Sequence, residues 1–227
     1  MLIKIALNGG RPEAPGTPDE IADDVAACAA AGATLFHVHP RAVDGKESLL
    51  PADADGVVDA IRRKAPNVRL GLTTGAWILP DVRRRLEAIG AWRRLPDFAS
   101  VNFDEDGCEP VARLLIERGI SVEAGVLDAA STRRFLDAAI PVERVLIELQ
   151  EQRLEDARRA IESILETLGD HAAPRLLHGH GAIVWEMFDE AVRRGYDSRI
   201  GLEDGGTLPD GRPATNRELF AMAQDRR

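Results

Sequence analysis

The sequence predicts an α/β fold, a (β/α)8 barrel built from a single domain over residues 1–227. Eight short apolar runs alternate with longer segments of helical period, which is the pattern of repeated βα units around a parallel sheet. The length of 227 residues is within the range of one domain and only slightly short of a typical eightfold barrel. No linker or shift in composition marks a second domain. An open, doubly wound sheet is the alternative, because it also uses βα units.

The predicted strands are short and bounded by turn residues. They cover residues 2–7, 34–39, 69–73, 98–102, 121–126, 145–149, 175–178 and 198–202. Thr17 before Pro18 predicts the start of the first helix, since a capping residue there precedes proline at the first helical position. Ser131 opens another polar-to-apolar run and predicts a second helix start. Glycines suited to helix ends lie a few residues before three of the strands: Gly32, Gly119 and Gly195.

Composition excludes several classes of partner. Hydrophobic residues make up 44% and charged residues 30%, which is typical of a globular chain. A formal net charge of −9 disfavours nucleic acid and anionic membranes, which bind clustered Lys and Arg. The first seven residues are too short for a signal peptide, and no apolar run approaches the roughly 20 residues of a membrane span. Two cysteines form no disulfide framework, so we expect a soluble protein of the reducing cytoplasm.

Polar side chains gather at the predicted carboxyl ends of the strands, where the βα loops of a barrel build its active face. They are Asn8, His37, His39, Thr73, Thr74, Ser100, Asn102, Glu123, Glu148, His178, His180, Glu203 and Asp204. This clustering predicts a functional site at that end of the barrel.

His37 and His39 indicate a metal site. Their i, i+2 spacing on a strand points both imidazoles to one face, here the barrel interior. Glu203, at the end of the eighth strand, is separated from them by the first strand only and supplies a third ligand. Two His and one carboxylate leave a position open for water or substrate, as a catalytic zinc requires. A pair of hydrogen-bonded core histidines is the alternative, and the acidic pair Glu203-Asp204 weighs against it.

The remaining candidates are assigned to the substrate. His178 and His180 form a second i, i+2 pair, but the neighbouring glycines indicate a mobile loop, so proton transfer, substrate polarisation or plain solvation is preferred to metal ligation. Thr73 and Ser100 have hydroxyls that either orient a substrate carboxylate or satisfy local backbone groups.

Taken together, these residues resemble the β-keto acid cleavage enzyme family, known through the 3-keto-5-aminohexanoate cleavage enzyme. The matching segments, in order, are residues 6–10 (ALNGG), 17–22 (TPDEIA), 31–33 (AGA), 37–41 (HVHPR), 72–75 (LTTG), 99–102 (ASVN), 201–205 (GLEDG) and 215–216 (TN). The resemblance runs from the first strand to near the carboxyl terminus. Each segment alone is weak, and their shared order is what makes the set specific.

The resemblance implies a zinc-dependent barrel that condenses a β-keto acid with acetyl-CoA and cleaves the product to acetoacetate and a new CoA thioester. It implies His37, His39 and Glu203 as zinc ligands and Asp204 as the base. Thr73 and Ser100 match positions that hold the substrate. We also place Asn8, Arg11, Arg41, Thr74, Asn102, His178 and His180 among the substrate-binding residues. A homo-oligomer, in the family a homotetramer, is a further implication.

Two departures from the family pattern concern charge. Arg11 stands where the family's first-strand loop usually carries a Glu, and Ala182 replaces the arginine that closes a Gly-x-Gly-Arg segment. A β-keto acid carries a carboxylate, so we predict that Arg11 has taken over anion recognition, with Arg41 as the competing candidate. An Arg11 that simply faces solvent is the alternative. The chain is also shorter than typical members, which trims the loops around the substrate.

Two other functions remain open from the sequence. A metal-dependent hydrolase also uses an HxH strand in a barrel, although the pair then usually lies on the first strand and a later Asp completes the site. The missing arginine at Ala182 is compatible with a catalytically degenerate, metal-binding family member.

Overall fold

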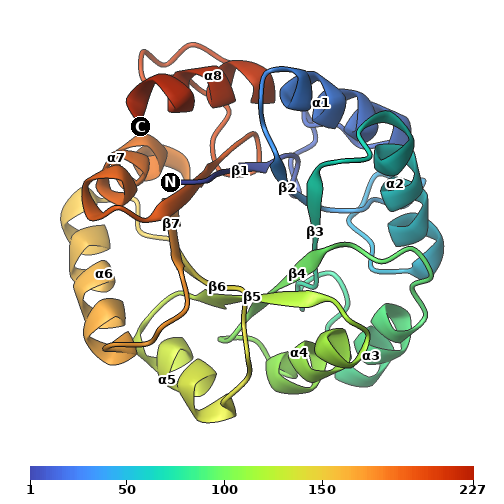
Figure 1. The fold of residues 1–227 in the computed structure, drawn as a ribbon, viewed down its shortest axis with the longest axis horizontal. Coiled ribbons are helices and arrows are strands. Elements are labelled where there is room, and N and C mark those ends of the chain that lie inside the picture. Colours follow the sequence, from blue (N-terminus) through green and yellow to red (C-terminus); the bar gives the residue numbers. More distant parts are fainter.

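Eight parallel strands close into a barrel in the computed structural model, which describes residues 1–227 (Figure 1). The strands are β1 (Ile3–Ala6), β2 (Leu35–Val38), β3 (Arg69–Thr73), β4 (Phe98–Asn102), β5 (Ser121–Val126), β6 (Arg144–Leu149), β7 (Arg175–Gly179) and β8 (Asp197–Ile200). Neighbours in sequence are neighbours in space, and β1 also pairs with β8 through Lys4 and Arg199. The predicted (β/α)8 barrel is confirmed, and the open sheet is wrong because no strand edge is left free.

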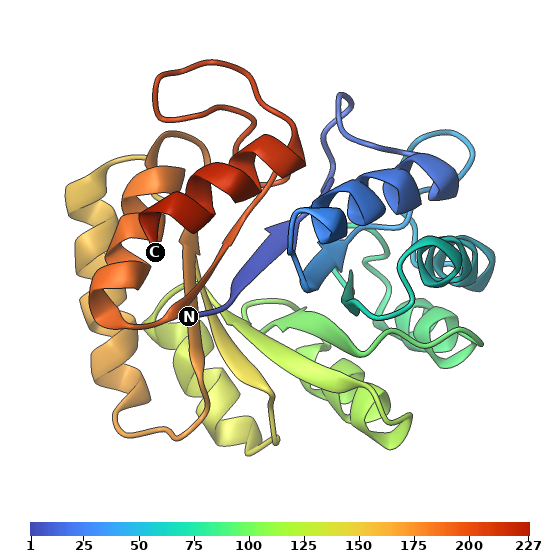
Figure 2. The ribbon, with the colours of Figure 1, turned by 45° about the horizontal axis from the view of Figure 1, so that its top comes forward.

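The helices form a ring outside the barrel, as Figures 1 and 2 show from two directions. They are α1 (Pro18–Ala30), α2 (Pro51–Lys64), α3 (Val82–Gly90), α4 (Cys108–Glu117), α5 (Ala129–Ala138), α6 (Leu154–Leu168), η1 (Gly181–Ile183), α7 (Val184–Arg194) and α8 (Asn216–Arg226). None of these helices is both long and apolar enough to cross a lipid bilayer. Their apolar faces pack on the outer faces of the strands in one continuous core.

Local sequence explains where helices begin and end. Thr17 caps α1 as predicted, and its side chain and that of Glu20 satisfy each other's backbone N–H groups. The predicted start at Ser131 is wrong by two residues. Asp128 caps α5 instead, because its carboxylate accepts the Ser131 N–H at 2.7 Å, while the Ser131 hydroxyl binds back to Asp128. Gly195 ends α7 in the left-handed region, with φ of 68°.

The barrel interior holds a buried ion-pair network on the side of the amino ends of the strands. Lys4 on β1 pairs with Glu123 on β5, and Arg144 on β6 lies 3.3 Å from the second Glu123 oxygen. All three side chains are almost fully buried. Glu123 is therefore not part of the predicted site: it lies near the start of its strand and neutralises cations inside the barrel.

Two predicted strand ends are shorter in the structure, and this changes where the site residues stand. β2 stops at Val38 and β8 at Ile200, so His39 and Glu203 lie in the turns that follow the strands. At Gly201 a Cβ atom would come within 2.0 Å of the Ala6 carbonyl oxygen. Only glycine permits this approach, which brings the turn after β8 over the end of β1.

Candidate active site

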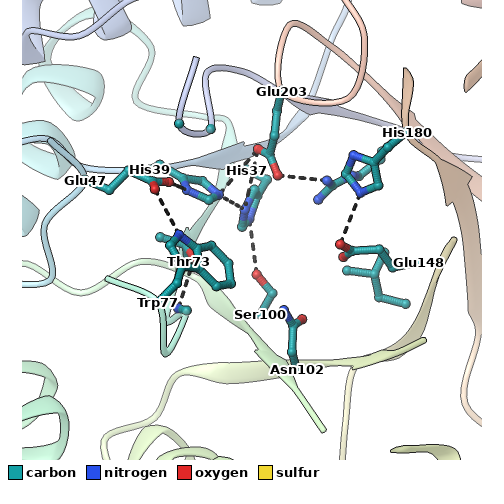
Figure 3. A pocket seen from close by; sticks show the side chains of 15 residues that line it. His37, His39, Glu47, Thr73, Trp77, Ser100, Asn102, Glu148, His180 and Glu203 are labelled. Atoms are coloured by element: carbon teal, nitrogen blue, oxygen red, sulfur yellow. Dashed lines mark hydrogen bonds and ion pairs between the residues drawn. The ribbon is translucent and has the colours of Figure 1, made fainter. Parts of the chain in front are cut away.

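A cavity of about 280 Å³ opens at the carboxyl ends of the strands (Figure 3). Its walls come from the loops after β1, β2, β3 and β8 and from the ends of β4, β6 and β7. They comprise Gly9, Gly10, His37, His39, Glu47, Thr73, Gly75, Trp77, Ser100, Asn102, Leu146, Glu148, His180, Arg199 and Glu203. All but two of these residues are polar, charged or glycine, which is the composition of a reaction site rather than of a lipid or apolar-ligand pocket.

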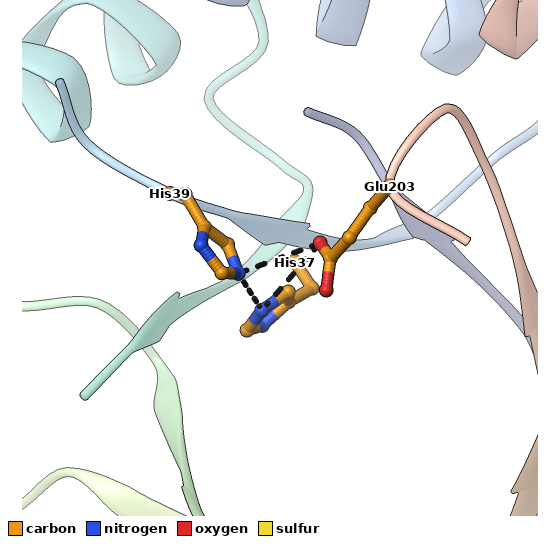
Figure 4. Close-up of side chains that lie close together, drawn as sticks. All are labelled: His37, His39 and Glu203. Carbon is orange, nitrogen blue, oxygen red and sulfur yellow. Dashed lines mark hydrogen bonds and ion pairs between the residues drawn. The ribbon is translucent and has the colours of Figure 1, made fainter. Parts of the chain in front are cut away.

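His37, His39 and Glu203 converge on one side of this cavity (Figure 4). The two Nε2 atoms lie 2.9 Å apart, and Glu203 Oε2 lies 3.8 Å from His37 Nε2 and 3.5 Å from His39 Nε2. Glu203 Oε2 is buried and has no hydrogen-bond partner. An orphaned carboxylate oxygen facing two imidazole nitrogens at these separations fits a divalent ion bound by all three groups.

The turn after β1 allows Glu203 to reach the histidines. Gly9 adopts a left-handed φ of 48°, and a Cβ atom there would come within 2.6 Å of Glu203 Cγ. The Glu203 side chain therefore passes directly over a glycine backbone. A side chain at position 9 would push Glu203 away from the two imidazoles.

His39 is held from three directions. Its Nδ1 makes a short contact with Glu47 Oε1, which is the usual way a carboxylate fixes the ring of a ligating histidine. Asn8 forms two bonds to the His39 backbone, accepting its N–H and donating to its carbonyl, each at 2.9 Å. Trp77 stacks on the imidazole with 6.2 Å between ring centroids and donates its Nε1–H to Glu47 at 2.9 Å. These contacts fix both the position and the tautomer of His39.

The part of the cavity wall formed by β3 and β4 is polar but uncharged. Ser100 Oγ lies 3.3 Å from His37 Nδ1 and lines the cavity, as do Thr73 and Asn102. Thr73 Oγ1 accepts the Gly75 N–H at 3.2 Å. Asn102 donates to Glu105 at 3.3 Å. Their remaining hydrogen-bonding capacity faces the cavity.

Arg199 is the only Lys or Arg on the cavity wall, and its guanidinium joins the two acidic residues of the turn after β8. Nη2 donates to Glu203 Oε1 at 2.8 Å and to Asp204 Oδ1 at 2.6 Å, while Nε donates to Asp204 Oδ2 at 3.0 Å. Nη1 forms no hydrogen bond to the protein. Arg199 therefore positions both carboxylates and keeps one donor group unused.

The charges around the triad favour a neutral His37 and an ionised Glu203. Burial lowers the pKa of His37 well below its ordinary value, more than Glu203 raises it. Burial also opposes ionisation of Glu203, but Arg199 and the two histidines hold its pKa well below the usual range. Burial lowers the pKa of His39, and the carboxylates of Glu203 and Glu47 outweigh this and raise it to about 9. The ion that fits this site would replace the proton held there by His39.

Comparison with known sequences decides the family. The profile of the beta-keto acid cleavage enzyme family matches residues 1–226. The chain belongs to the β-keto acid cleavage enzyme family.

Two kinds of relative agree with this family membership. The 3-keto-5-aminohexanoate cleavage enzyme of Fusobacterium nucleatum subsp. nucleatum is 28% identical over 127 residues, which cover 52% of this chain and 47% of that enzyme. The alignment thus spans about half the length of this curated relative. Among solved structures, the ternary complex of ObcA with C4-CoA adduct and oxalate superposes with a TM-score of 0.69 at 18% identity, covering 94% of this chain and 63% of that one. Native KDPGal superposes over 99% of this chain and 95% of its own, with a TM-score of 0.63 at 15% identity. Both likenesses concern the barrel fold.

Several predicted site residues of this β-keto acid cleavage family member lie off the cavity wall. Asn8 is fully buried, and its side-chain amide is hydrogen-bonded to the His39 backbone. Thr74 is buried and donates to the Ser100 carbonyl at 2.7 Å. Arg41 donates to the carbonyls of Gly9 and Arg11, so it fastens the loop after β1. These residues shape the site rather than face a substrate.

Arg11 also lies outside the cavity wall, and its anion-binding role stays a prediction. Its Nε donates to the Glu203 carbonyl at 3.2 Å, Nη1 lies 3.6 Å from Glu13, and the side chain is 38% exposed. The alternative of a solvent-facing loop arginine fits these contacts. At the other departure from the family pattern, Ala182 is exposed and its N–H donates to Gln152 at 3.1 Å, so no side chain replaces the family arginine there.

Sequence reasoning missed Arg199, Glu47 and Trp77. An arginine inside a predicted barrel strand is a usable signal for Arg199, because an inward cation requires carboxylate partners. Glu47 and Trp77 lie in long βα loops whose path depends on tertiary packing. No spacing rule connects either of them to His39.

Proposed function

We propose that this protein transfers an acetyl group by carbon–carbon bond cleavage, using a β-keto acid and acetyl-CoA. In balanced form, RCOCH2COO⁻ and CH3CO-SCoA give CH3COCH2COO⁻, which is acetoacetate, and RCO-SCoA. Family membership and the convergence of His37, His39 and Glu203 in an open polar cavity support this proposal. The observation that carries it is the unpaired Glu203 oxygen facing two imidazole nitrogens.

Zinc is the ion that this donor set fits best, since two imidazoles and one carboxylate leave an open position in tetrahedral geometry. When bound, it supplies a Lewis acid that polarises the keto oxygen and offsets the charge that develops there. Glu47 and Ser100 would keep the two imidazoles oriented toward the ion through their Nδ1 atoms.

The substrate's own charge requires a partner in the cavity. Arg199 has an unused Nη1 group and lines the cavity, so we assign it to the carboxylate of the β-keto acid. Thr73, Ser100 and Asn102 add uncharged donors on the neighbouring wall. With an ionised Glu203 beside it, Arg199 is held in one orientation before the substrate arrives.

Asp204 is the proposed proton acceptor: it takes a proton from the α-methylene of the β-keto acid, and the resulting carbanion attacks the acetyl-CoA carbonyl. It is fully buried, and Arg199 donates to both of its oxygens. His180, which does line the cavity, has its Nδ1 3.3 Å from Asp204 Oδ1. Asp204 thus stands directly behind two residues that contact the cavity.

A screen of β-keto acids with acetyl-CoA tests the proposed reaction. We expect zinc-loaded protein to release acetoacetate with at least one keto acid of the panel, because the site has a metal, an anion donor and room for a small acid. Acetoacetate is measured by a coupled dehydrogenase assay, and chelator-treated protein is the control. Metal-loaded protein that consumes no keto acid while binding one saturably would instead show a degenerate member of the family.

Substitutions of the two arginines separate the anion donors. Arg11→Ala is expected to change the KM for the keto acid by less than about twofold, because its guanidinium bonds to the loop and solvent. Arg199→Lys is expected to lower kcat/KM by about tenfold or more, since lysine lacks the planar fork that serves several acceptors at once. Steady-state kinetics against each substrate measure both effects. A raised keto-acid KM in Arg11→Ala with an unchanged acetyl-CoA KM would restore Arg11 as the anion donor.

A further inference from the structure

A second group of side chains that could ligate a metal stands across the cavity from His39, and the reaction proposed above assigns no metal to it. Glu148 on β6 is the direct cross-strand partner of His178 on β7, so both point into the barrel. His180 follows at i+2. We propose that Glu148, His178 and His180 bind a second divalent cation of the zinc class. This second site is inferred from the three side chains alone and does not depend on the reaction proposed above.

The glycines beside this histidine pair predicted a loop, and in the structure only His180 lies outside a strand. His178 lies within β7, and its side chain is completely buried. His180 immediately follows the strand and is partly buried, with Glu148 as its neighbour on the cavity wall (Figure 3).

The separations between the three groups match a single ion. His178 Nε2 lies 3.6 Å from Glu148 Oε2, and His180 Nε2 lies 3.1 Å from Glu148 Oε1. Tetrahedral bonds of about 2.0–2.1 Å place ligand atoms about 3.3 Å apart. The two imidazoles are edge-to-face, with centroids 5.1 Å apart, close to the 4.9 Å of His37 and His39. The second cluster therefore has the same donor set as the first, two imidazoles and one carboxylate.

Asp204 orients both imidazoles for this role. Its Oδ1 lies 3.3 Å from His180 Nδ1 and 3.7 Å from His178 Nδ1. A carboxylate that receives the Nδ1–H of a histidine leaves Nε2 as the ligand atom, which is the arrangement around most ligating histidines. Arg199 Nε lies 3.1 Å from His178 Nδ1 and 3.0 Å from Asp204 Oδ2. Arg199 Nε donates its one proton to both atoms, so ligation through His178 Nε2 requires that Asp204 take this hydrogen bond and that Nδ1 carry the imidazole proton.

An unpartnered atom points to a missing ligand. His178 Nε2 is buried and has no hydrogen-bond partner. Gln150 also contacts the cluster, donating to Glu148 Oε1 at 2.8 Å and leaving Oε2 available. A buried nitrogen without a partner is costly unless it meets an ion or water. Glu148 Oε2 lies 3.6 Å from this nitrogen.

The charge of the region also favours a second cation. Glu47, Glu148 and Glu203 line the cavity and Asp204 stands behind it, whereas Arg199 is the only Lys or Arg on its wall. A single divalent ion at His37, His39 and Glu203 leaves this buried region with net negative charge. Imidazole ligands select zinc or a similar transition metal over Mg²⁺ or Ca²⁺, which prefer oxygen ligands alone.

Zinc titration of chelator-stripped full-length protein tests the proposal without reference to activity. We expect two equivalents of Zn²⁺ per chain by calorimetry and by elemental analysis after gel filtration. Glu148→Gln and His180→Gln should each bind one equivalent fewer, while circular dichroism shows an intact fold. Glu105→Gln is the matched control, because Glu105 is a partly buried carboxylate beside Asn102 that is outside the cluster, and it should keep both equivalents.

A crossed comparison with His39→Ala separates the two sites. Each single variant should retain the other site's equivalent, and the double variant His39→Ala/Glu148→Gln should bind none. If wild-type protein binds one equivalent that Glu148→Gln keeps and His39→Ala loses, the second site is overturned and the first stands. If the single equivalent is instead lost in Glu148→Gln and kept in His39→Ala, the second site stands and the proposed catalytic metal site fails.

Discussion

Replacing His39 with alanine is expected to empty the His37/His39/Glu203 site and reduce turnover by about a thousandfold or more. Removing one of three protein ligands leaves two, too few to hold a catalytic zinc. Loss of its Lewis acidity costs several kcal/mol of transition-state stabilisation, at about 1.4 kcal/mol per tenfold. The barrel should remain folded, because its core lies between strands and helices and does not include this site. Zinc analysis, turnover and thermal unfolding are measured on the same preparation.

The matched control is His171→Ala. His171 lies between α6 and β7, away from both histidine clusters, and its ring packs on Phe135 with centroids 5.1 Å apart. It should keep wild-type metal content and turnover. Full zinc occupancy of the first site in His39→Ala, with activity preserved, would show that the ligands are misassigned.

Asp204→Asn is expected to lower turnover by about a hundredfold or more while the first site keeps its zinc. The substitution preserves the shape of the side chain and removes the proton acceptor, and general bases contribute on that order. Exchange of the α-methylene protons of the β-keto acid with deuterated water, above the uncatalysed rate, reports the proton-transfer step by itself. That exchange should fall in parallel with turnover.

Asp97→Asn is the control for this second prediction. Asp97 also binds an arginine, accepting from Arg62 at 2.7 Å, but it precedes β4 at the far end of the barrel. Its α-proton exchange should equal that of wild type. Wild-type exchange and turnover in Asp204→Asn would make Asp204 a purely structural partner of Arg199 and require another base.

The sequence predicted the fold well because strands and helices follow local patterns. Apolar runs and glycine stops placed all eight strands within two residues of their observed bounds. The pair His37 and His39 was accessible for the same reason, since the alternation of a strand fixes which side chains share a face. The convergence of Glu203 with them was a prediction about neighbouring strands in a closed ring, and the structure brings these three groups together.

What the sequence left open depends on how far side chains reach and on how loops fold back. Arg11 and Arg41 both belong to loops near the cavity, and only three-dimensional packing shows that their guanidinium groups bond to backbone carbonyls. Asn8 lies just after β1, and its amide donates to the backbone carbonyl of His39 instead of facing the cavity. Glu47 reaches His39 from a loop eight positions away in sequence, a contact that no periodicity indicates.

The most direct test of the proposed reaction is the fate of isotopically labelled acetyl carbons. Zinc-loaded protein is supplied with acetyl-labelled acetyl-CoA and the β-keto acid that it turns over. The account predicts that the label appears in acetoacetate, at its carbonyl and methyl carbons, and that the new CoA thioester carries only the unlabelled acyl group of the keto acid. Unlabelled products formed equally well without acetyl-CoA would contradict the account and indicate a metal-dependent hydrolase.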